Sequence, residues 1–82
     1  YIDGVDASFV LYRENGTVFI SARSMGAVNV QLIMEAIGGG GHLTMAGAQL
    51  QGVTLAEARQ KLMEAIDVYQ ASRAVKKLPA KV

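Results

Sequence analysis

An arginine and a glycine run that ends in a histidine are the residues of this chain best suited to bind an anion. Gly38, Gly39, Gly40 and Gly41 follow one another, and His42, the only histidine, comes next. Backbone N–H groups without neighbouring Cβ atoms can approach a ligand closely, as cradling a phosphate requires. Arg23 offers a guanidinium, which binds phosphate through two parallel hydrogen bonds. Together these residues predict a site for a phosphate-containing ligand.

Hydroxyl groups near these residues can assist such a site. Ser21, Ser24 and Thr44 can add neutral hydrogen bonds, and the imidazole of His42 can donate to a phosphate or contact a nucleobase. Simpler interpretations exist for all of them. The glycines can form a flexible connection, the arginine can be a solvated surface charge, and the serines can be ordinary polar positions at a strand edge. The residues alone leave both interpretations open.

Catalytic and metal-binding chemistry have little support in this sequence. The chain has one histidine and no cysteine, and no carboxylate stands at a ligand spacing from the histidine, which argues against a metal site. His42 also lacks a partner for general acid or base catalysis. We interpret Asp3 and Asp6 as solvated. We therefore expect neither catalytic nor metal-ligating residues here.

Length, composition and charge limit the number of domains and the classes of function that the chain can have. A chain of 82 residues with 51% hydrophobic residues predicts one packed domain spanning residues 1–82. Eight basic and seven acidic residues nearly balance, so charge alone does not indicate a nucleic-acid-coating protein. Four of the basic residues fall in the last ten positions, and we expect residues 73–82 to form a flexible basic tail.

The start of the chain carries no recognisable targeting signal. The start, YIDGVDAS, has no initiator methionine and no signal-peptide pattern, so we expect a piece of a longer protein. No apolar run has the length of a membrane span, and we expect no membrane contact by this fragment.

The elements that must position the site begin with a hairpin. Residues 7–13 and 17–23 are rich in β-forming side chains, and Asn15-Gly16 between them is a dipeptide typical of tight hairpin turns. Residues 46–51 predict a third strand, weakened by Gly47.

Two helices complete the predicted fold. Asn29 is a candidate N-cap for a short helix with an apolar stripe from Val30 to Ile37, and Gly38 is its expected left-handed stop. Thr54 and Glu57 have the spacing of a capping box and begin a second helix, which we expect to fray somewhere after Tyr69 and to end at the latest before Pro79. The predicted fold is a small two-layer α+β domain, in which a hairpin and a further strand pack against two helices.

These motifs together resemble a known family. SARS at residues 21–24, VNVQLIMEAIGGGGH at residues 28–42 and the strand that follows resemble the DHH-associated C-terminal domain of DHH-family phosphoesterases. The resemblance covers residues 7–66. It implies that Arg23 contacts a substrate phosphate, with Ser24 beside it, and that the four glycines and His42 line a nucleotide pocket.

The resemblance also implies a division of labour between two domains. A separate upstream domain carries an Asp-His-His motif and two divalent metals, usually manganese, which activate water for attack on a phosphodiester. The C-terminal domain holds the substrate, so this fragment alone is expected to be inactive. The context of Leu43-Thr44 and Ala48-Gln49 is most similar to membrane-anchored cyclic-di-AMP phosphodiesterases of the GdpP type. These imply a bacterial parent with this domain on the cytoplasmic face, cyclic di-AMP as substrate, pApA as product, and a homodimer as one possible assembly.

Two other functions remain open at this stage. The first is the lobe of a nuclease that acts on short oligonucleotides or single-stranded DNA, which favours a basic groove with exposed aromatic rings. The second is a non-catalytic RNA-binding module, because a similar domain ends alanyl-tRNA synthetases. The affinity of such a module would fall steeply with added salt.

Overall fold

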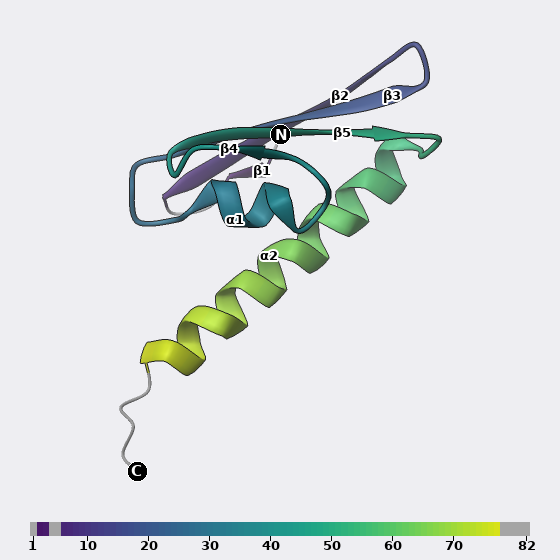
Figure 1. Ribbon diagram of the computed structural model, residues 1–82. Helices are drawn as coiled ribbons and strands as arrows, with labels where there is room; N and C mark the ends of the chain where they lie inside the picture. The colour runs from purple at the N-terminus through teal and green to yellow at the C-terminus, as the bar shows by residue number, and fades with distance from the viewer. Residues whose placement is uncertain (1, 4–5, 78–82) are drawn as a thin grey trace.

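The computed structural model describes residues 2–3 and 6–77. These form a five-stranded antiparallel sheet in the order β1-β2-β3-β5-β4, with both helices on one face (Figure 1). This arrangement confirms the predicted two-layer α+β fold. The elements are β1 Ile2–Asp3, β2 Ala7–Glu14, β3 Thr17–Ser24, α1 Val30–Glu35, β4 Gly40–Gly41, β5 Met45–Gln51 and α2 Leu55–Lys77.

The predicted hairpin forms strands β2 and β3. Asn15 and Gly16 both have positive φ, at 52° and 79°, as the tight turn between twisted strands requires. Glu14 pairs with Thr17 next to the turn, and the register continues without a bulge to Ala7 opposite Ser24. The hairpin prediction is confirmed, with each strand one residue longer than expected.

The core lies between the sheet and the two helices. Alternate residues of β3 and β5 face the helices and are buried, whereas the residues between them face the other side of the sheet. This is the period-two pattern of a sheet with one covered face. The buried residues are Phe9, Val18, Ile20, Ala22, Val30, Ile33, Met34, Ala46, Ala48, Leu50, Ala58, Leu62 and Ala65.

Helix α1 is capped as the sequence predicts. The Asn29 side chain accepts a hydrogen bond from the Leu32 N–H at 3.3 Å, which satisfies one orphan donor of the first turn. Gly38 has φ of +89°. The N–H of Gly38 donates to Glu35 and that of Gly39 to Met34, which is the hydrogen-bond pair of a Schellman C-cap.

Helix α2 begins at the predicted capping box and ends between Tyr69 and Pro79. Thr54 and Glu57 exchange hydrogen bonds of 2.8 and 3.0 Å between side chain and backbone N–H. The helix then runs to Lys77, which is eight residues beyond Tyr69 and two residues before Pro79. The Tyr69 hydroxyl accepts from the Asn29 N–H at 2.8 Å, and the Arg73 guanidinium lies 5.7 Å from the Tyr69 ring centroid. These contacts support the helix where it leaves the sheet.

The first half of the predicted tail is therefore helical. Residues 73–77 belong to α2, because nothing in their sequence interrupts the helix before Pro79. Residues 78–82 lie outside the described residues, and their flexibility stays a prediction.

Two short strands were not predicted. β1 pairs with β2, and β4 pairs with β5. A strand of two residues carries too little pattern to be seen in sequence, and β4 consists of two glycines, which are depleted in strands.

Candidate functional site

Three of the four consecutive glycines are required by the fold. Gly38 needs its positive φ to end α1. A Cβ on Gly39 would overlap the Gly47 carbonyl oxygen and would lie 2.6 Å from the Ala48 Cβ. A Cβ on Gly41 would lie 2.5 Å from the Ala46 Cα. Strand β4 approaches β5 this closely only because both residues lack side chains.

Gly40 is the exception within the run. It has no positive φ, and a Cβ built on it would meet nothing within 4 Å. It pairs with Gly47 of β5, and its Cβ direction is opposite to those of Gly39 and Gly41, which point to the helix side. The fold thus gives no reason for a glycine at this position, whereas close approach of a ligand would.

The backbone donors of the run are mostly used inside the domain, which corrects part of the sequence argument. The N–H groups of Gly38 and Gly39 cap α1, and that of His42 donates to Met45 at 2.7 Å. Since His42 and Met45 exchange two hydrogen bonds, the alternation of an antiparallel ladder makes Gly40 the next bonded residue and directs the Gly41 N–H away from β5. The prediction of four successive free amides is therefore wrong. Within the run, the N–H of Gly41 is the backbone donor that remains directed away from the sheet.

A two-residue turn holds this region to the rest of the sheet. Leu43 and Thr44 connect β4 to β5, between the bonded pair His42 and Met45. The Thr44 carbonyl accepts from the Ser24 N–H and the Leu43 carbonyl from the Val30 N–H, both at 3.0 Å. The turn therefore joins the end of β3 to the start of α1, and it gives the histidine a defined place.

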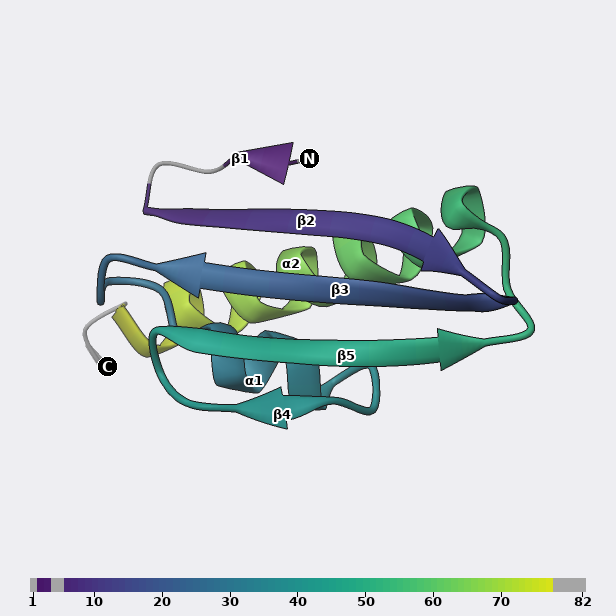
Figure 2. The ribbon, with the colours of Figure 1, turned by 90° about the horizontal axis from the view of Figure 1, so that it is seen from above.

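The sheet brings Arg23 and His42 to the same end of one face. Arg23 pairs with Met45, and Met45 in turn faces His42 across the turn. Directly opposed residues of an antiparallel sheet place their side chains on the same face. Arg23 and His42 are two strands apart, about 10 Å between backbones, and both are exposed. Figure 2 looks onto this face, which no helix covers.

The next rows of the same face contain small residues and then aromatic rings. The Arg23 row consists of Arg23, Met45 and His42. The next row on this face consists of Ser21, Gly47 and Gly40, which lie side by side on β3, β5 and β4. Two residues further along, the rings of Tyr12 and Phe19 stack with centroids 5.1 Å apart and an interplanar angle of 14°. The sequence did not predict this pair, although both residues stand at positions of the alternating strand pattern that face away from the core.

Ser24 follows Arg23 at the end of β3 but stands at the phase of Val18, Ile20 and Ala22, so strand alternation directs its side chain away from the Arg23 face. Its Oγ accepts a hydrogen bond from the Gly26 N–H at 3.0 Å, and its hydroxyl proton remains able to donate. Ser21 and Thr44 are exposed. Within residues 2–3 and 6–77, no three His, Asp or Glu side chains cluster as a metal ion would require.

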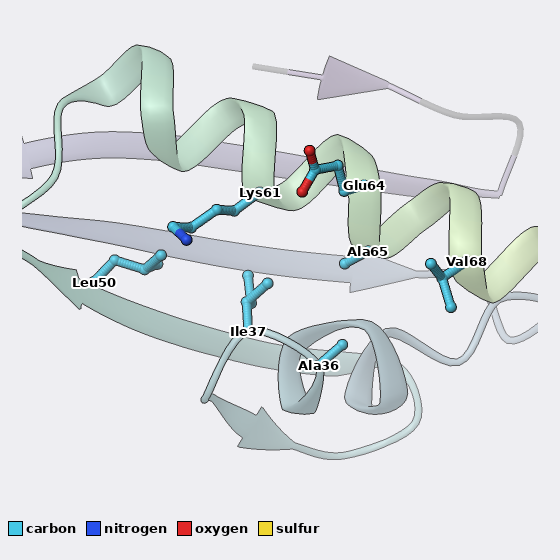
Figure 3. Close-up of a pocket in the computed structure, with 7 residues that line it drawn as sticks. All are labelled: Ala36, Ile37, Leu50, Lys61, Glu64, Ala65 and Val68. Carbon is cyan, nitrogen blue, oxygen red and sulfur yellow. The ribbon is translucent and has the colours of Figure 1, made fainter.

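A groove on the opposite side of the sheet contains none of these residues. It has a volume of about 500 Å³ and lies between the end of α1, β5 and α2 (Figure 3). Its only charged lining residues are Lys61 and Glu64, and the rest are apolar. This lining lacks the convergent donors that hold a phosphate. The groove marks the part of the sheet that short α1 leaves uncovered.

Comparison with known proteins shows the family of this chain. The family model described as "DHHA1 domain" matches residues 2–72. The chain belongs to the DHHA1 domain family. The predicted resemblance is confirmed, because DHHA1 is the DHH-associated domain that the SARS and GGGGH motifs indicate.

Several curated bacterial relatives of this DHHA1 domain are named as cyclic-di-AMP phosphodiesterases. The domain is 64% identical over 69 residues to "Cyclic-di-AMP phosphodiesterase GdpP" of Geobacillus thermodenitrificans and 55% identical over 69 residues to "Cyclic-di-AMP phosphodiesterase PdeA" of Listeria monocytogenes, with 83% of the chain covered in each. It is 39% identical over 66 residues, 80% of the chain, to "Bifunctional oligoribonuclease and PAP phosphatase NrnA" of Thermus thermophilus.

The DHHA1 domain is a small part of these relatives. It spans 10% of the length of GdpP and PdeA and 20% of the length of NrnA. In the described part of the domain, no helix combines the length and hydropathy needed to cross a membrane.

Proposed function

We propose that this domain is the substrate-holding lobe of a bacterial phosphodiesterase that hydrolyses cyclic di-AMP to linear pApA. The relatives named for this activity support the substrate. The observation that carries the binding role is the position of Arg23 and His42 on one uncovered face, beside a strip where Gly40 and Gly47 leave the backbone bare. An anion and the sugar attached to it can lie against such a surface.

Each residue has a definite task in this proposal. The Arg23 guanidinium holds a phosphate through two parallel hydrogen bonds. His42 donates to the same phosphate or contacts a base, while the outward N–H of Gly41 adds a weaker hydrogen bond. Gly40 admits the ligand to the backbone of β4. Gly38 and Gly39 support the site by shaping the turn.

Hydrolysis itself belongs to another part of the parent protein. Two-metal hydrolysis needs clustered carboxylates and imidazoles, and the described residues contain no such cluster. We place the two divalent metals, with manganese as the first candidate, in an upstream DHH domain of the same chain. This fragment is then inactive alone. A membrane anchor and a homodimer of the parent belong to the same proposal.

Loss of Arg23 should remove most of the binding. We expect Arg23→Ala to raise the Kd of this chain for pApA by roughly 10- to 100-fold, as for a charged hydrogen-bonding partner. Titration followed by amide NMR measures it, with shifts expected at residues 38–42 and at Arg23. Arg13→Ala is the matched control, because Arg13 is exposed but pairs with Val18 on the helix side of the hairpin, far from the site. Unmoved amides, or equal effects of the two variants, would refute the proposal.

Gly40→Ala should separate binding from folding. Its Cβ has open space, so we expect an unchanged or slightly higher thermal midpoint. The added methyl group points to the proposed ligand, and we expect the Kd for pApA to rise about tenfold. The same titration and a thermal melt measure the two quantities. Unchanged affinity would mean that no ligand approaches β4 on this face.

A second function is supported by the likeness to NrnA. That relative is named as an oligoribonuclease, and the stacked Tyr12–Phe19 rings on the open face, of which Tyr12 is exposed, are suited to single-stranded substrates. Hydrolysis of cyclic di-AMP and of short RNA by the parent protein discriminates the two functions. An RNA-binding module would instead show affinity that falls steeply with salt and no hydrolysis by the parent.

A further inference from the structure

The Tyr12–Phe19 pair is an aromatic surface without a covering element. Both residues lie at the outward phase of their strands, opposite Val18 and Ile20, which face the core. Tyr12 is 49% exposed, although a tyrosine ring in contact with a second ring has much apolar surface to hide. Both helices lie on the other side of the sheet (Figure 2).

We infer that this ring pair is a stacking site for a second nucleobase of a substrate whose phosphate is held at Arg23. The inference rests on the proposed function of Arg23. Phe19 and Arg23 are four residues apart on β3, about 13 Å along an extended strand. That separation is roughly the reach of an extended dinucleotide. A mononucleotide held at Arg23 is too short to reach both ends of the surface.

The residues between the two ends leave room for the connecting sugar and phosphate. Gly47 and Ser21 form the intervening row with Val10, so only one branched side chain stands between the arginine row and the rings. On this face the guanidinium of Arg23 lies at one end, and the carboxylate of Glu14 lies beyond the rings, near the hairpin turn. The charge therefore favours a phosphate only at the arginine end.

A nucleobase is the occupant that fits both ends. Every base has a π face, and stacking on an aromatic side chain is tolerant of base identity. An apolar protein partner would have no use for a guanidinium and an imidazole at the end of the surface. The ring pair thus gives the domain a means to prefer dinucleotides and short oligonucleotides to mononucleotides.

The test compares two ligands and three variants of the 82-residue chain. Tyr12→Leu is expected to raise the Kd for pApA by roughly 5- to 100-fold and to change the Kd for AMP less than about twofold, which is our threshold for no effect. Tyr12→Phe keeps the ring and should restore pApA binding. Arg23→Ala should weaken both ligands. Amide NMR titration gives the Kd values, and a thermal melt of each variant shows that it is folded.

The outcomes separate this inference from the function on which it depends. If Arg23→Ala weakens both ligands while Tyr12→Leu weakens neither, the stacking site is refuted and the proposed function stands. Equal weakening of AMP and pApA by Tyr12→Leu also refutes it, since the ring would then act through the fold. If Arg23→Ala changes neither affinity, the proposed function fails.

Discussion

Replacing Gly39 by alanine is expected to destabilise the domain at or above the upper end of the ~1–3 kcal/mol typical of overpacking. The added Cβ would overlap the Gly47 carbonyl oxygen and lie 2.8 Å from the Ala48 Cα. These are backbone atoms, which cannot rotate away as a flexible side chain can. The strand β4 must move off β5, and the Schellman cap that uses the Gly39 N–H is strained with it.

Thermal unfolding measures the effect, and Gly40→Ala is the matched control. For a domain of this size we expect Gly39→Ala to lower the thermal midpoint by at least about 10 °C. Gly40→Ala adds the same methyl group one residue away, where nothing lies within 4 Å, and should shift the midpoint upward or not at all. Similar midpoints for the two variants would contradict the close pairing of β4 with β5.

Leu62→Ala is expected to have the largest effect on stability. Leu62 lies on α2, is 0% exposed and belongs to the core. Truncating a buried leucine costs about 2–5 kcal/mol through lost transfer free energy and the cavity left behind. A domain of this length has a total stability of only about 4–12 kcal/mol, so a large fraction of it would be lost.

Chemical denaturation of Leu62→Ala measures this loss directly, and Met63→Ala is the control. Met63 is the next residue on the same helix and is 36% exposed, so its truncation should cost less than about 1 kcal/mol. Equal losses in the two variants would show that α2 does not pack on the sheet through Leu62. A lower slope of free energy against denaturant would indicate a change in the denatured state instead.

The structure gives the glycine run a mainly structural role, whereas the candidate site stays at the same end of the sheet. The run was interpreted as a row of free amides, yet two of its amides cap α1 and two of its glycines allow β4 to approach β5. The domain uses these residues to hold His42 and the Leu43–Thr44 turn beside Arg23. In the proposed site, side chains together with Gly40 and Gly41 would bind the ligand, whereas the other glycines maintain the local backbone geometry.

This division also explains why the groove beside α2 is a poor candidate for the site. Its lining is mainly apolar and its two charged residues, Lys61 and Glu64, are of opposite sign. A phosphate gains from convergent donors and loses from a nearby carboxylate. The uncovered face of the sheet offers an arginine and an imidazole at one end.

The sequence by itself determined the elements whose signals are local. Asn15-Gly16 specifies its hairpin turn, Asn29 and Thr54 cap their helices, and Gly38 ends α1, because each of these interactions involves residues within about five positions of one another. The family motif also identified the fragment from its sequence. Tertiary structure decided which glycines the fold needs, where β4 lies, and that Arg23, His42 and the Tyr12–Phe19 pair share one face. The hairpin turn sets the pairing of Tyr12 with Phe19. The other features depend on strand pairing between distant residues and on which face the helices cover, and no local pattern contains that information.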